Sequence, residues 1–310
     1  MTALATAIGA GVAATGLAVA FARRRRTDVV ARYVAARLGA PDRDGVVRGA
    51  TAIEHDRSAT HAVLLLHGFG DTPQSLAGLA ADLADVHGWT VRVPLLPGHG
   101  RTLEAFAASR ADDWLAAARQ AHDALRTTHA HVSLVGLSMG GALATVEAAR
   151  VGDACEALVL LAPYLTPTIV ARRVAATAPI AQAFVPWFAP AADQSRSIID
   201  PDALAQNLGY GTSSPRLVRE LVRVADRARA AAAAVRAPVR IVHGRHDYRV
   251  PAPLAATHPA LFTAAAAVTL DWLDDTGHVV TVDRQRARVW AMVGEWLAGR
   301  GVGGRADPGA

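Results

Sequence analysis

The sequence contains no lysine, only one cysteine and few aromatic residues. The single thiol, Cys155, excludes an internal disulfide and a zinc site with CxxC spacing. A lone cysteine of this kind is typically a small buried apolar residue. Six Phe, four Tyr and six Trp residues make a base-stacking surface unexpected. Because lysine is absent, all 32 basic residues are arginine, which we interpret as the codon bias of a GC-rich genome.

Charge gives no signal for a nucleic-acid partner. The formal net charge is +5, but Arg23–Arg26 supply four of these charges, so the rest of the chain is nearly neutral. No basic stripe with interleaved aromatic residues remains, and nucleic-acid binding is therefore not expected. With 52% hydrophobic residues in 310, the chain can bury a core, which excludes a disordered protein. The length fits one large α/β domain or two small ones.

Residues 1–22 carry no charge and are followed directly by the arginine run. As a helix they would span roughly 33 Å, about one bilayer core, although nine alanines and three glycines dilute their apolar character. A secretory signal peptide has its positive charges before the apolar run, whereas here the arginines follow it. By the positive-inside rule, these arginines would stay on the cytoplasmic side of a membrane. We interpret residues 1–26 as a membrane anchor that leaves the main domain at the cytoplasmic face. A disordered leader or a mis-assigned start codon, in a cytoplasmic protein, are the alternatives.

Apolar runs alternate with amphipathic stretches between residues 59 and 298. The runs expected as strands buried on both faces are Ala62–Leu66, Thr90–Val93, Val132–Val135, Leu158–Leu161, Val239–Val242 and Val268–Leu270. The stretches expected as helices are 74–86, 112–128, 139–151, 253–265 and 283–297. This alternation predicts an α/β fold with a mostly parallel central sheet and helices on both faces.

The remaining segments are expected to lie outside the alternating layers. Residues 27–58 are interpreted as a linker and entry segment with a short helix or linker at 29–38, and residues 299–310 as a flexible glycine-rich tail. The interval between the strands at 158–161 and 239–242 is too long for one crossover helix. We predict a helical cap at about 163–235, whose aromatic residues Phe184, Trp187 and Phe188 are candidate substrate contacts. These three residues could equally form the core of the cap. The alternative to a cap is that this interval forms a second small domain unrelated to the chemistry.

The sequence Gly136-Leu137-Ser138-Met139-Gly140-Gly141 directly follows a predicted strand and precedes a predicted helix. This is the G-x-S-x-G pattern in the strand, turn and helix context that it requires. Glycine is needed at 136 and 140 because neighbouring chains pass too close for side chains. The turn exposes the hydroxyl of Ser138 and aims a helix N-terminus at it, so Ser138 is the predicted nucleophile.

A serine hydroxyl needs a base to take its proton and a carboxylate to orient that base. In hydrolases with this turn the chain order is serine, acid, histidine. Asp247 follows the predicted strand at 239–242, and His278 follows the predicted strand at 268–270. Since both lie past the carboxyl ends of parallel strands, we predict that they meet Ser138 at one edge of the sheet.

Other residues compete for these two roles. His243 and His246 precede the acid, so their place in the chain is wrong for the base, and loop hydrogen bonds are their simpler role. Asp271, Asp274 and Asp275 lie too close in sequence to His278 for the usual arrangement on two loops. The tetrahedral intermediate also needs two donors for its oxyanion. We predict the backbone N–H of Met139, after the nucleophile, and that of Phe69, in the turn His67-Gly68-Phe69-Gly70.

Together these segments resemble the α/β-hydrolase superfamily, and more closely the bacterial carboxylesterase and monoacylglycerol lipase group. The resemblance covers roughly residues 60–298 and rests on L-L-L-H-G-F-G (64–70), P-L-L-P-G-H-G (94–100), D-D-W (112–114), G-L-S-M-G-G (136–141), G-R-H-D (244–247) and G-H-V-V-T-V-D (277–283). It implies Ser138 as nucleophile, His278 as general base and then acid, Asp247 as the orienting carboxylate, and no metal or organic cofactor.

The expected activity is therefore that of a serine hydrolase that cleaves apolar acyl esters, either short-chain carboxylesters or monoacylglycerols, through an acyl-enzyme. A small-molecule ester is the expected partner. A thioesterase or amidase would use the same triad, and a catalytically silent, membrane-tethered binding protein would keep the fold without the reaction. No metal site is expected. His243 and His246 lie three residues apart, but they belong to the loop of the predicted catalytic acid, and no other histidine or cysteine cluster has metal-ligand spacing along the chain.

Overall fold

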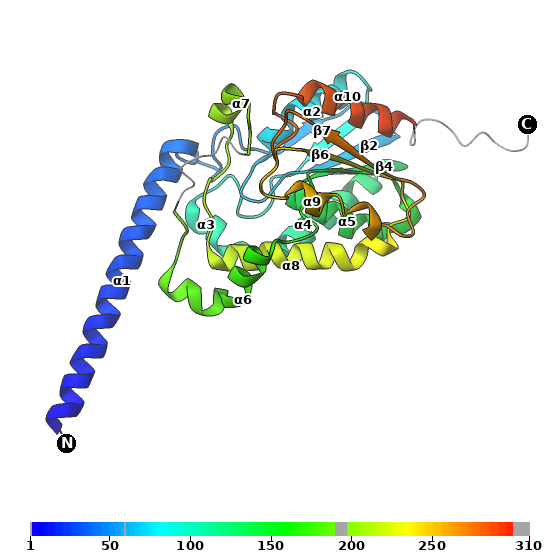
Figure 1. Cartoon of the computed structure of the whole chain (residues 1–310). Helices are drawn as coiled ribbons and strands as arrows, with labels where there is room; N and C mark the ends of the chain where they lie inside the picture. The colour runs from blue at the N-terminus through cyan, green and yellow to red at the C-terminus, as the bar shows by residue number, and fades with distance from the viewer. Residues whose placement is uncertain (1, 59, 190–196, 300–310) are drawn as a thin grey trace, which may run out of the picture.

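The computed structural model describes residues 2–58, 60–189 and 197–299 (Figure 1). The strands are β1 (Ile53–His55), β2 (His61–Leu66), β3 (Thr90–Val93), β4 (His131–Leu137), β5 (Cys155–Leu161), β6 (Val239–Gly244) and β7 (Val268–Leu273). The α-helices are α1 (Thr2–Leu38), α2 (Ala77–Asp85), α3 (Leu103–Ala108), α4 (Ala111–Arg126), α5 (Met139–Val151), α6 (Ile169–Phe184), α7 (Pro201–Gln206), α8 (Pro215–Ala231), α9 (Ala252–Ala255) and α10 (Arg286–Leu297). The flexible tail was predicted at residues 299–310, and its residues from 300 onward lie outside the described part of the chain.

The strands form one sheet in the order β1-β3-β2-β4-β5-β6-β7. All neighbours from β3 to β7 pair in parallel, and only β1 runs antiparallel, against β3. The predicted α/β class with a mostly parallel sheet is therefore confirmed. β1 was not predicted, because its sequence Ile-Glu-His contains no apolar run.

Two apolar cores lie on opposite faces of this sheet. Successive strand residues point to opposite faces, so Val63 and Leu65 join the core under α2 and α10. Leu64 and Leu66 join the core under α4, α5 and α8. Figure 1 shows these two helical layers above and below the sheet. The near-continuous apolar sequences of the central strands follow from this double burial.

Two of the predicted elements differ in the structure. The run Val268–Leu270 was expected to be buried on both faces, but β7 is the last strand of the sheet and Thr269 is exposed. The helix expected at 253–265 is only α9, four residues long, followed by a 3₁₀ turn at Pro259–Leu261. Pro259 explains the interruption, because proline lacks the N–H that would continue the helical hydrogen bonds to the carbonyl of Ala255.

The interval between β5 and β6 contains α6, α7 and α8. α8 packs on α5, and its residues Val224 and Ala228 are part of the core on the sheet. α6 packs on α8 from the outside. The predicted cap at 163–235 therefore includes α8, which covers the sheet together with α5. Of the described residues of the predicted cap, those before Pro215 lie outside this helical layer.

The N-terminal segment is one continuous helix, α1, that crosses the predicted boundary at residue 26 (Figure 1). The expectation of a separate short helix or linker at 29–38 is therefore wrong. Among the described residues, no helix has both the length and the apolar content needed to cross a bilayer.

The last turns of α1 are attached to the body of the protein. Val30, Val34 and Leu38 recur every four residues, so they form one stripe on the helix. This stripe is buried in a third apolar cluster together with Trp187 and Tyr210. The C-terminal part of α1 is thus a structural part of the domain and not a solvated linker.

We expect Val30→Ala to destabilise the protein by roughly 1–3 kcal/mol, because Val30 is 1% exposed and the substitution removes buried methyl groups. Val29→Ala is the matched control, since the neighbouring side chain is 48% exposed and should contribute less than about 0.5 kcal/mol. Urea unfolding of both variants measures the difference. Equal effects would contradict the docking of α1.

Candidate active site

Ser138 lies at a sharp turn between β4 and α5. Its backbone has φ 54° and ψ −114°, a conformation that non-glycine residues rarely adopt. A Cβ on Gly140 would lie 1.9 Å from the carbonyl oxygen of Leu66, and one on Gly136 would lie 2.2 Å from that of Gly140. Both positions therefore require glycine, and the close approach of the chains holds the turn in its strained form.

The structure brings Ser138, His278 and Asp247 together. Oγ of Ser138 lies 2.8 Å from Nε2 of His278, and Nδ1 of the same ring lies 2.7 Å from Oδ2 of Asp247. Ser138 follows β4, Asp247 follows β6 and His278 follows β7, so the carboxyl ends of three parallel strands supply the three groups. All three residues are buried, which strengthens their hydrogen bonds.

Asp247 is held as a carboxylate. Its Oδ1 accepts hydrogen bonds from the backbone N–H groups of Arg249, at 2.8 Å, and Val250, at 3.0 Å. Burial by itself would raise the pKa of Asp247, but the neighbouring His278 and His243 outweigh that effect and hold the pKa below its ordinary value. The group is therefore ionised at neutral pH and can stabilise a positive charge on His278.

The competing residues take other roles. Asp271, Asp274 and Asp275 form ion pairs with Arg240, Arg245 and Arg284, at 2.9, 2.6 and 3.0 Å respectively. His246 is exposed. Nε2 of the buried His243 lies 2.9 Å from the carbonyl oxygen of Val250 and 3.2 Å from Oδ2 of Asp247. His243 therefore supports the loop that carries the carboxylate.

The two predicted oxyanion donors, Met139 and Phe69, belong to segments that adjoin Ser138. Met139 is the first residue of α5, and N–H groups in a first helical turn have no partner within the helix. Phe69 lies in a turn closed by a hydrogen bond of 3.4 Å from the N–H of Asp71 to the carbonyl of Gly68. A Cβ on Gly68 would lie 3.4 Å from Cβ of Ser138, so this turn packs directly against the nucleophile.

A cavity of about 450 Å³ opens over Ser138 and His278. Apolar side chains of α6 and α8 line it, among them Val170, Val174 and Leu221. Of the three predicted aromatic contacts, only Phe188 reaches this cavity. Phe184 is 61% exposed, and Trp187 is buried in the cluster that holds α1.

Three charged residues that sequence reasoning missed also line the cavity: Arg37, Asp71 and Arg249. Arg37 comes from α1, and its guanidinium donates to the carbonyl of Gly209, at 2.7 Å. Asp71 is buried, which raises its pKa, and it accepts a hydrogen bond of 2.6 Å from the hydroxyl of Ser75. Asp71 and Arg249 each lie two residues from a predicted site residue, whereas no sequence signal indicates Arg37.

Residues 57–285 match the family described as serine aminopeptidase, S33. A thermostable monoacylglycerol lipase from Bacillus sp. (strain H-257) is 36% identical over 109 residues, which cover 35% of this chain and 43% of that lipase. The chain thus spans less than half the length of this curated relative.

Solved structures of lipolytic enzymes are also similar. A structure from a study of LipS and LipT, two metagenome-derived lipolytic enzymes, has a TM-score of 0.73 and 26% identity, and the match covers 82% of this chain and all of that one. A monoacylglycerol lipase from Paleococcus ferrophilus has a TM-score of 0.67 and 19% identity, covers 80% and 98% of the two chains, and shows the fold alone. The expected resemblance to α/β hydrolases of the lipase and esterase type is confirmed.

We expect Asp247→Asn to lower kcat/KM for an ester about 10³- to 10⁴-fold, because the imidazole loses the partner that fixes its tautomer. Asp274→Asn and Asp275→Asn are the controls, since both residues lie on the His278 loop but pair with arginines. Steady-state hydrolysis of a chromogenic ester measures all three variants. A greater loss in either control than in Asp247→Asn would assign the acid to the His278 loop.

Proposed function

Because the chain belongs to the serine aminopeptidase S33 family of α/β hydrolases, we propose that it is a serine hydrolase of carboxylic esters with apolar acyl groups, either short-chain carboxylesters or monoacylglycerols. The observation that carries the proposal is the series of hydrogen bonds from Asp247 through His278 to Ser138, which ends at a cavity with apolar walls. The lipolytic enzymes among the similar proteins support it.

Acylation begins with the hydroxyl of Ser138. As Oγ attacks the ester carbonyl, Nε2 of His278, 2.8 Å away, takes the proton. The Asp247 carboxylate, 2.7 Å from Nδ1, stabilises the imidazolium that forms. We assign the binding of the oxyanion of the tetrahedral intermediate to the N–H groups of Phe69 and Met139. His278 then returns the proton to the leaving alcohol, and the acyl group remains on Ser138.

Deacylation repeats these steps with water. His278 takes a proton from a water molecule, whose oxygen attacks the acyl-enzyme, and then gives the proton back to Oγ of Ser138. The products are a carboxylic acid and the free enzyme. Every proton transfer in both halves of the reaction uses the same nitrogen, so the geometry at Nε2 of His278 determines the rate of both.

The walls of the cavity support an apolar acyl group. Val170, Ala171 and Val174 of α6 and Leu221 of α8 lie along one side. A volume of about 450 Å³ is within the range of small-molecule sites. Contact with these side chains would remove an acyl chain from water, which favours binding by about 0.8 kcal/mol for each buried CH₂ group. The enzyme's rate should therefore depend on the length of the acyl chain.

Two alternatives share parts of this structure. A thioesterase or amidase would use the same three residues on a different bond, and a panel of thioesters and amides beside the esters separates these activities. A catalytically silent binding protein would keep the cavity but lack an activated serine. A fluorescent phosphonate separates this alternative, because only an activated serine reacts with it.

We expect Ser138→Ala to lower ester hydrolysis by roughly 10⁴- to 10⁶-fold and to abolish phosphonate labelling. Ser133→Ala is the matched control, because Ser133 is also buried in β4 but does not line the cavity. Esters from acetyl to palmitoyl and monoacylglycerols serve as substrates. Near-normal hydrolysis by Ser138→Ala would contradict the proposed mechanism.

We also propose that residues 1–26 bring the enzyme to the cytoplasmic face of the membrane. Leu17 and Phe21 are 73% and 69% exposed and precede the arginine run Arg23–Arg26. Exposed apolar side chains beside arginines are the combination that binds anionic lipid surfaces, at about 1 kcal/mol for each arginine near the surface. Arg23 also donates hydrogen bonds to the main chain of α6 at Gln182 and Ala183, which connects this segment to the cavity wall.

The full-length protein is therefore expected to sediment with membranes in low salt and to be released by high salt. Replacing Arg24, Arg25 and Arg26 by glutamine should leave it in the supernatant, because the attraction to anionic lipid is lost. Fractionation followed by an esterase assay measures both. Sedimentation that only detergent reverses, or a native protein that stays in the supernatant at low salt, would contradict the proposal.

A further inference from the structure

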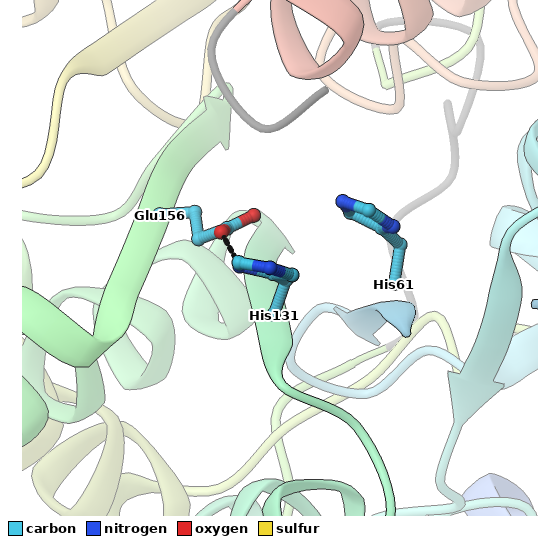
Figure 2. Close-up of side chains that lie close together, drawn as sticks. All are labelled: His61, His131 and Glu156. Carbon is cyan, nitrogen blue, oxygen red and sulfur yellow. Dashed lines mark ion pairs between the residues drawn. The ribbon is translucent and has the colours of Figure 1, made fainter. Parts of the chain in front are cut away.

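Three side chains lie close together at the amino ends of their strands (Figure 2), whereas Ser138 follows the carboxyl end of β4. His61 is the first residue of β2, His131 is the first residue of β4, and Glu156 is the second residue of β5. Their ligand atoms all lie within 4.8 Å of one another. Nothing in the proposed reaction uses them.

The strand register places the two histidines on one face. His61 and His131 are direct partners in the parallel pairing of β2 with β4. Their rings stack with centroids 4.7 Å apart and planes inclined by 16°. The hydroxyl of Thr60 lies 2.8 Å from Nδ1 of His61, a contact that orients the ring as an outer hydrogen-bond partner does at a metal site.

An irregularity in β5 brings the carboxylate to the same face. The pairing of β4 with β5 steps from Val132–Cys155 to Leu134–Leu158, so β5 advances three residues while β4 advances two. An extra residue of this kind changes the direction of a side chain. The carboxylate of Glu156 forms an ion pair with Nδ1 of His131, marked by the dashed line in Figure 2.

We propose that His61, His131 and Glu156 bind a divalent transition-metal ion, for which Zn²⁺ is the best fit. Two imidazole nitrogens and one carboxylate oxygen are a typical zinc donor set, with water as the fourth ligand. Around a tetrahedral zinc ion with bonds of 2.0–2.1 Å, ligand atoms lie about 3.3 Å apart. The ligand atoms lie within 4.8 Å of one another, so side-chain movements of about 1.5 Å bring them to this separation. The side chains of His131 and Glu156 are 45% and 19% exposed, so an ion can reach the site from solvent.

The other cluster of possible ligands in the described part of the chain does not carry this inference. It consists of His122, Asp123 and Glu147. The guanidinium of Arg150 already donates hydrogen bonds to both carboxylates of that cluster. A metal ion there would have to displace this cation, whereas no arginine pairs with Glu156 among the described residues.

The ion would connect three adjacent strands and act on stability. His131 and Ser138 lie at opposite ends of β4, about 23 Å apart at 3.3 Å per residue. The metal would therefore not reach the reacting atoms. Because the three ligands come together only in the folded chain, binding favours the folded state.

The test uses the untagged full-length protein, treated with EDTA and then freed of the chelator. Calorimetric titration with Zn²⁺ should give one ion per chain, and zinc should raise the temperature of unfolding. Co²⁺ should produce the visible absorption of a tetrahedral site. His61→Gln, His131→Gln and Glu156→Gln should each weaken zinc binding by at least the 10- to 100-fold that loss of an outer partner costs.

His129→Gln is the matched control, because His129 lies at the same edge and donates to the carbonyl of Ser58 but is not one of the three ligands. It should bind zinc like the native protein. Circular dichroism and ester hydrolysis, both unchanged in all four variants, exclude misfolding. EDTA should lower the unfolding temperature of the zinc-bound protein without lowering kcat. Absence of zinc binding at micromolar concentrations, or unchanged binding in the three ligand variants, would overturn the proposal.

Discussion

The backbone conformation of Ser138 is the constraint on which the site depends. At φ 54° the chain turns from β4 into α5 within one residue, which a side chain tolerates only when its surroundings hold it there. Gly136 and Gly140 allow those surroundings to approach to within contact distance of backbone atoms. The hydroxyl consequently stands clear of the sheet, where the loops after β6 and β7 bring Asp247 and His278 to it.

Parallel pairing divides the sheet into two chemically different edges. The carboxyl ends of the strands carry Ser138, Asp247 and His278, together with the cavity that opens over them. The amino ends carry His61, His131 and Glu156, whose ligand atoms lie within 4.8 Å of one another. The zinc ion proposed for the second edge would therefore act on the stability of the strand pairing and not on the proposed reaction.

Much of the fold could be predicted because its signals are local. Central strands are continuous apolar runs, and Ser138 occurs in a six-residue pattern that follows such a run. Contacts over long distances in the sequence could not be predicted in this way. Trp187 packs into a cluster with α1 while the adjacent Phe188 faces the cavity, and only tertiary packing decides between them. The histidines at the amino edge were missed for the same reason, since strand register, and not spacing along the chain, makes them neighbours.

The contribution of α1 to the cavity has a consequence for comparing this enzyme with its family. The shared region begins at residue 57, yet Arg37 of α1 forms part of the cavity wall. Substrate preferences inferred from relatives by alignment over this region therefore leave out the contribution of Arg37. A chimera built from residues 57–285 alone would keep Ser138, Asp247, His278 and the α6 and α8 side of the cavity, but it would lack the contribution of Arg37.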